Sequence, residues 1–137
     1  MKKLLLVSVL LGSVLLMAGS SNAKKASNDE MKKTMQNMEV SMAFIQKGFL
    51  YNHKGRIKKG ITSLRRELKN INSFVIENDK NIKFNAKQYA EKETKALDLL
   101  ASGILKDFEE GNKEVVLINF EQMLDRCVTC HALVRKW

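Results

Sequence analysis

Residues 112–135 read NKEVVLINFEQMLDRCVTCHALVR, and the spacing within this stretch decides the fold class. Side chains of core type recur at alternating steps of three and four, which is the spacing of one face of an α-helix. The positions are Leu117, Phe120, Leu124, Cys127, His131 and Val134. Cys127 and His131 thus share this face with apolar residues, and Cys130 lies one turn from Cys127. Burying polar groups without partners costs about 1–3 kcal/mol each. We therefore expect a bound group at that end of the helix.

Three further stripes of the same kind precede this helix. Their members are Met31, Met35, Met38, Met42, Ile45 and Phe49, then Ile57, Ile61, Leu64, Leu68 and Ile71, then Ala90, Leu97, Leu100, Ile104 and Phe108. Gly111 and Asn112 predict a helix stop followed directly by the next N-cap. The chain has no proline, and no useful length of β-type alternation. The sequence predicts an all-α protein, an up-down-up-down four-helix bundle with short connections.

The N-terminus has the pattern of an export signal. Lys2 and Lys3 precede an apolar run of 14 residues at positions 4–17, and small residues then lead to Ala23. This run is shorter than the roughly 20 residues that cross a membrane, and no cysteine follows it to carry a lipid. We expect residues 1–23 to be a cleavable signal peptide and residues 24–137 to form one domain. That domain would lie outside the cytoplasm, most simply in a bacterial periplasm, without a stable membrane anchor.

The sequence Cys127-Val128-Thr129-Cys130-His131 carries the chemistry. At about 100° per residue, the two thiols and the imidazole leave one sector of the helix. Two thiols three residues apart can form thioethers with the vinyl groups of a haem, and the adjacent imidazole can reach its iron. A thioredoxin site expects a strand–helix context, a zinc site needs further ligands beyond His53, and a disulfide within one helical turn is strained. The motif predicts one covalent haem c with His131 as axial ligand.

These residues make the sequence resemble the cytochrome c′ family, including its low-spin relatives with a methionine ligand. The resemblance spans residues 24–137 and is most specific near the end, at Gly111, Phe120, Cys127, Cys130, His131 and Arg135. It implies a haem near the C-terminal end of a four-helix bundle, with Arg135 beside the haem. Lys47 and Gly48 resemble the end of the family's first helix. The sequence departs from the family in a short second connection and in Val134, where an aromatic residue is usual.

The residue on the other side of the iron decides the function. In an up-down bundle the start of the first helix faces the end of the fourth, which places Met35 opposite His131. Counting back from Lys47 and Gly48, as the resemblance suggests, points to Met31 instead. A methionine bonded to iron gives a low-spin electron carrier, whereas an open position binds NO or another small gas. Methionines of this stripe also fit plain core packing, so the alternatives stay open.

The charge of the chain bears on its partners. The net charge is +9, and it falls to +7 when Lys2 and Lys3 leave with the signal peptide. Such a protein attracts acidic redox partners by long-range steering. Nucleic acid is not expected, because the chain is exported and has no aromatic-basic surface motif. A peroxidase would want an acid–base group beside the iron, so we do not expect an enzyme. A homodimer is suggested by analogy with the family alone.

Overall fold

The computed structural model describes residues 28–71 and 86–135, and the side chains of residues 29–71 and 88–133. They form four helices, α1 (Asn28–Leu50), α2 (Lys54–Ile71), α3 (Ala86–Glu110) and α4 (Lys113–Arg135). No strand occurs in these ranges, which confirms the all-α class and is compatible with the predicted four-helix bundle. The expected signal peptide and residues 72–85 lie outside the described residues. None of the described helices is long and apolar enough to span a membrane.

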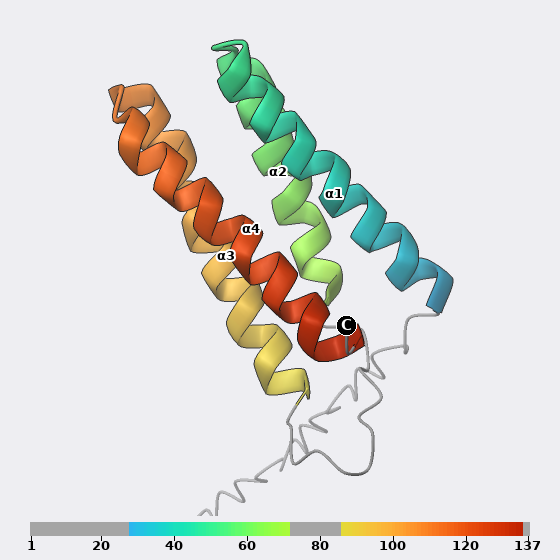
Figure 1. Cartoon of the computed structure of the whole chain (residues 1–137). Coiled ribbons are helices and arrows are strands. Elements are labelled where there is room, and N and C mark those ends of the chain that lie inside the picture. Colours follow the sequence, from blue (N-terminus) through green and yellow to red (C-terminus); the bar gives the residue numbers. More distant parts are fainter. Residues whose placement is uncertain (1–27, 72–85, 136–137) are drawn as a thin grey trace, which may run out of the picture.

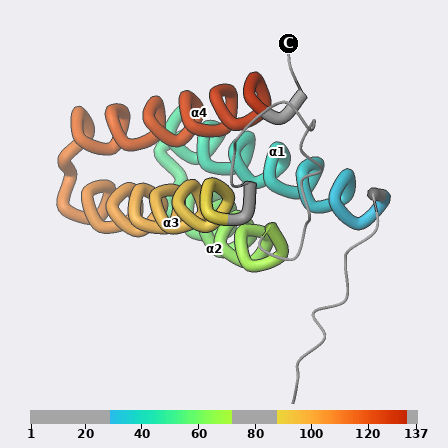
Figure 2. The backbone as a smooth tube through the Cα atoms, turned by 90° about the horizontal axis from the view of Figure 1, so that it is seen from below, coloured from blue at the N-terminus to red at the C-terminus, as the bar shows by residue number. Residues whose placement is uncertain are grey.

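The helices form two hairpins, α1 with α2 and α3 with α4, which meet where α2 packs on α3 (Figure 1). The backbones of α1 and α4, in their described residues, do not approach within 8 Å of each other between Cα atoms. Seen from below, α4 lies over α3, and α1 and α2 lie beside them (Figure 2). The start of α1 and the end of α4 lie at the same end of the molecule.

Both short connections end a helix in the same way. Gly111 has a φ of 79° and Asn52 a φ of 48°, the left-handed region that glycine and asparagine adopt at helix ends. The amides of Asn112 and His53 donate to the carbonyls of Asp107 and Gly48, five residues earlier, at 2.8 Å. The predicted stop at Gly111 is confirmed. His53 is exposed and caps α2, since its Nδ1 accepts from the amide of Arg56 at 3.3 Å.

Two glycines let α1 and α2 pack closely. A Cβ atom built on Gly60 of α2 would lie 2.8 Å from the carbonyl oxygen of Ser41 and 2.9 Å from the amide nitrogen of Ile45. One built on Gly48 of α1 would lie 2.9 Å from the amide nitrogen of Ile57. These are backbone atoms, which cannot move aside as a flexible side chain does. The close approach of α1 and α2 therefore depends on the absence of a Cβ atom at Gly48 and Gly60.

Apart from Met31, the members of the predicted stripes of the first three helices are buried or pack against the hydrophobic core, but α4 is rotated from the expected position. Val116 and Met123 are the buried residues of α4, whereas Leu117 and Leu124 remain 53% and 51% exposed. The predicted stripe is confirmed at Phe120 and Cys127, which pack against the core, and is wrong at Leu117 and Leu124. The reason is that α4 carries apolar residues on several sides, so periodicity alone does not fix which side faces inward. Contacts with α3 fix which side of α4 faces inward, as described below.

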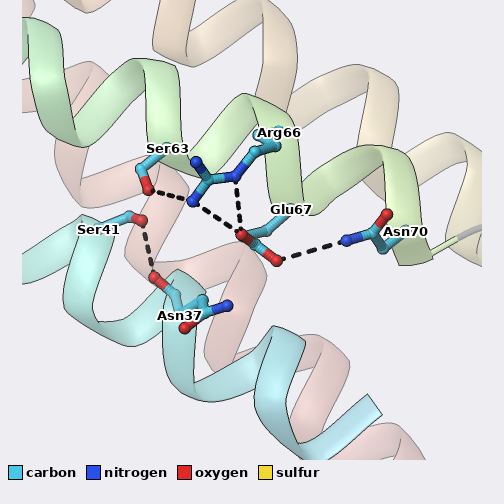
Figure 3. Close-up of polar contacts among 6 residues, drawn as sticks. All are labelled: Asn37, Ser41, Ser63, Arg66, Glu67 and Asn70. Atoms are coloured by element: carbon cyan, nitrogen blue, oxygen red, sulfur yellow. Dashed lines mark hydrogen bonds and ion pairs between the residues drawn. The ribbon is translucent and has the colours of Figure 1, made fainter. Parts of the chain in front are cut away.

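One carboxylate is buried in the first hairpin. Glu67 of α2 is 4% exposed, and it accepts hydrogen bonds from Nε of Arg66 at 3.1 Å and from Nδ2 of Asn70 at 3.4 Å (Figure 3). On the facing helix, the Ser41 hydroxyl donates to the carbonyl of Asn37 at 2.7 Å. Polar groups in this interface are thus paired within their own helices.

Candidate functional site

The thiols and imidazole of the motif lie together on α4. Cys127 is half-buried and packs against the hydrophobic core, and Cys130 and His131 are half-buried beside it. Both cysteines are free thiols. Their neighbours within the motif, Val128 and Thr129, are exposed. The helix therefore turns the three reactive side chains away from solvent and the two spacer residues toward it, as the predicted sector requires.

Burial controls the ionisation of the two thiols. It raises the pKa of Cys127 to about 11, and the negative charges of ionised Cys130 and of Glu93 act in the same direction. Burial and Glu93 also raise the pKa of Cys130. Both thiols are consequently protonated at neutral pH in the chain without a cofactor. They are poor candidates for thiolate nucleophiles, which depend on a lowered pKa.

An ion pair between α3 and α4 holds this part of α4 in place. Nη1 of Arg126 lies 2.9 Å from Oε2 of Glu93, whose side chain is 12% exposed. Closer to the connection, Nδ2 of Asn119 donates to Asp107 at 3.2 Å. These contacts lie on one side of α4 and set its rotation. Sequence reasoning missed Glu93, although Glu93 and Arg126 lie at similar distances on either side of the turn at Gly111.

A shallow polar hollow lies on the outer side of this ion pair. Its volume is about 250 Å³, and its lining is Tyr89, Glu93, Gln122, Asp125, Arg126 and Thr129. Burial raises the pKa of Tyr89, with Glu93 contributing. The hollow is below the usual range of small-molecule pockets, about 300–1,000 Å³, and is a groove between two helices.

Both predicted methionines lie on α1, whose described Cα atoms all stay more than 8 Å from those of α4. Met35 is half-buried and packs against the core, and Met31 is half-buried in the first turn of α1. The rings of Phe49 and Phe120 meet edge to face at 5.3 Å between centroids, which sets the register of the antiparallel α1 and α4. Equal rise along both helices from that contact makes Met38 level with His131. Arg135 ends α4, and its side chain lies outside the described residues.

One buried hydroxyl of α3 is unpaired within the described ranges. Oγ1 of Thr94, next to Glu93 on α3, is buried and forms no hydrogen bond with any of the described residues. The hydroxyls of Ser41 and Ser102 instead donate to carbonyls four residues earlier, at 2.7 and 2.9 Å. A buried unpaired hydroxyl costs about 1–3 kcal/mol, which a bound group with polar atoms would relieve.

These features fit a haem. The residues offer two free thiols and an imidazole on one side of α4, and α3 carries a buried hydroxyl that has no hydrogen-bond partner in the described ranges. The separation of the α1 and α4 backbones is compatible with a flat group between those helices. Within the described ranges no three side chains of His, Cys, Asp or Glu gather into a metal site. Comparison with protein families, with curated proteins and with solved structures finds no match.

Proposed function

We propose that this chain is an exported monohaem c-type cytochrome that carries electrons in the periplasm. Haem c would be held through Cys127 and Cys130, with His131 as axial ligand. The observation that supports this most is the common placement of the three side chains, half-buried on one side of α4. Bound haem supplies one-electron chemistry at its iron.

The chain's own residues would hold and shield such a group. Cys127 packs against the core, so its sulfur is a fixed point of attachment. The ion pair of Glu93 and Arg126 fixes the rotation of α4 behind the sulfurs. Met35 would cover the opposite side from α1, with Met31 as the other candidate. Arg135 would approach the haem carboxylates from the end of α4.

A second candidate function is the binding of NO or another small gas. It is favoured by the separation of α4 from α1, the helix that carries Met31 and Met35, because no Cα atoms of the two described helices lie within 8 Å of each other. Met38, which is level with His131, is buried at 7% exposure within the core. If no methionine reaches the iron, the sixth position stays open for a gas.

Attachment is tested by producing the full chain in a host that matures c-type cytochromes. Mass spectrometry should show residues 24–137 plus one haem, and C127A and C130A should each lose one thioether. H131A should keep the haem attached but change its absorption spectrum, whereas H53A, the control at the other histidine, should not. A bare polypeptide, or a bridge between Cys127 and Cys130 in place of haem, would overturn the proposal.

The two candidate functions are separated by the ferric spectrum. A low-spin spectrum with a methionine-to-iron charge-transfer band supports the electron carrier. The ligand is then identified from M31A and M35A, of which one should become high-spin. A high-spin parent protein whose ferrous form binds CO or NO supports the gas-binding alternative. M42A, which alters another half-buried methionine of α1, is the control.

A further inference from the structure

The outward side of α4 carries a column of exposed apolar residues. Leu117, Leu124 and Val128 are 53%, 51% and 44% exposed. Spacings of seven and four residues place them above one another on the helix. Their exposure results from the rotation of α4 that buries Val116 and Met123 instead. The column therefore lies outside the core that the other three helices share.

A column of carboxylates runs beside the apolar one. Glu114, Glu121 and Asp125 are exposed and repeat the same spacing, about 60° further around the helix. Of the basic residues of α4, Lys113 lies in the first turn, Arg126 is paired with Glu93, and Arg135 ends the helix seven residues beyond Val128. We name these six residues the α4 face. It is apolar and acidic, although the chain as a whole is basic.

The α4 face lies next to the proposed attachment site. Val128 stands between Cys127 and Cys130 in the sequence, and it is exposed where they are half-buried. Electron transfer slows steeply with distance. A partner that covers Val128 would therefore approach any group held by the two sulfurs more closely than a partner elsewhere.

The main basic surface lies on a different helix. Lys58, Lys59 and Lys69 are exposed on α2, and the described α2 and α4 have no Cα atoms within 8 Å of each other (Figure 2). Attraction to that surface would hold an acidic partner away from the cysteines. Proximity to the proposed attachment motif thus favours α4 as the docking site of a redox partner, whereas the net charge of the chain favours α2.

We propose that the α4 face is the docking surface for a redox partner protein that presents an apolar patch framed by lysines or arginines. This inference rests on the proposed function, because it takes α4 to carry the redox group. Charge complementarity selects the partner: basic side chains pair with the carboxylate column while apolar groups cover Leu124 and Val128. A second copy of the chain is disfavoured, because two α4 faces would oppose their own carboxylates.

The test uses the haem-loaded protein, first confirmed by its mass, and two inorganic probes. Hexaammineruthenium(III), a cation, takes one electron from the ferrous protein, which becomes ferric as ruthenium(III) becomes ruthenium(II). Ferricyanide, an anion, takes one electron in the same way and becomes ferrocyanide, and no bond or proton changes in either reaction. If electrons leave through the α4 face, added salt should slow the cation reaction and accelerate the ferricyanide reaction.

Charge variants locate the effect. E121K/D125K should slow the cation reaction by about threefold or more at low salt and reverse its salt dependence. K58E/K59E/K69E, which makes an even larger change in net charge, should change the rate much less. The proposal is overturned if the α2 variant dominates or if salt accelerates the cation reaction of the parent protein. Absence of haem from the purified chain would contradict the proposed function instead.

Two further measurements test whether a second copy of the chain or α1 covers the α4 face instead of a redox partner. Sedimentation equilibrium should show no dimer that the substitution L124D dissociates. Such a dimer would mean that a second copy of the chain occupies the α4 face. A maleimide should label L117C in the haem-loaded protein, because the α4 face stays exposed. A protected cysteine in a monomer would mean that α1 covers this face on haem binding, and the proposal would fail.

Discussion

At the scale of single residues, Cys127 combines core packing with a place in the proposed haem-attachment motif. Its thiol is held protonated by burial, with a pKa of about 11 against an ordinary value of 9.0. A proton held more tightly in the folded state than in the unfolded state links stability to pH. The unfolded chain ionises first as the pH rises, so ionisation favours unfolding.

This predicts an alkaline loss of stability in the full chain produced without haem. The contribution of the Cys127 thiol to the free energy of unfolding should be intact below about pH 9 and should be lost between about pH 9 and 11. Its size is on the order of 2 kcal/mol. Urea unfolding at several pH values measures it, and C127A should remove most of this pH dependence.

The same residue supplies a spectroscopic control. Haem attachment converts the thiol to a thioether, which does not titrate, so the thiolate absorbance that develops near pH 11 should vanish in the loaded protein. A thiol that titrated at its ordinary value of 9.0 would contradict the burial of Cys127.

At the scale of elements, the hairpin of α1 and α2 depends on contact between backbones. Gly60 faces the carbonyl of Ser41 and the amide of Ile45. Gly103 of α3 differs, since a Cβ there would lie 3.1 Å from the side-chain amide of Asn119, the movable end of a side chain.

We therefore predict that G60A lowers the free energy of unfolding by about 1–3 kcal/mol through overpacking. G103A should be close to neutral, because the small shift of Asn119 is offset by a gain in helix propensity of up to about 1 kcal/mol. Urea denaturation of both variants measures the difference. Equal stability of G60A and the parent protein would show that α1 and α2 pack less closely than described.

At the scale of the whole molecule, the two hairpins meet along α2 and α3, and α1 and α4 meet through aromatic rings. Arg65 of α2 donates from Nε and from Nη2 to the two carboxylate oxygens of Asp98 on α3, with Nη2 at 3.1 Å from Oδ2. Phe49 of α1 contacts the rings of Phe108 and Phe120. Beyond Phe49 and Phe120, α1 and α4 continue toward the cysteines without close backbone contact.

We predict that F49A and F120A are coupled by about 0.5–1.5 kcal/mol in a double-mutant cycle. The unfolding free energies of the parent, both single variants and the double variant give this coupling. F49A with L99A serves as the control cycle, because Leu99 is 72% exposed on α3. Additive effects of F49A and F120A would show that the two rings do not interact. The register that makes Met38 level with His131 would then lack its supporting contact.

Features that depend on neighbours in the sequence were predictable. Apart from Met31, the apolar stripes of the first three helices are buried or pack against the core, and Gly111 ends α3 as expected. The common sector of Cys127, Cys130 and His131 also follows from helical geometry alone. Periodicity, caps and motif spacing act over a few residues, so the sequence contains them directly.

Only the tertiary structure decided the rotation of α4 and the level of each methionine. Apolar residues of α4 lie on several sides of the helix. Its inward side is set by the contacts of Glu93 with Arg126 and of Asp107 with Asn119. The register against α1 comes from Phe49 and Phe120. These contacts join residues that are distant in the chain, and their geometry depends on how whole helices fit together. The sequence by itself therefore determined the helices and the common sector of Cys127, Cys130 and His131, and packing determined which residues of the other helices face that sector.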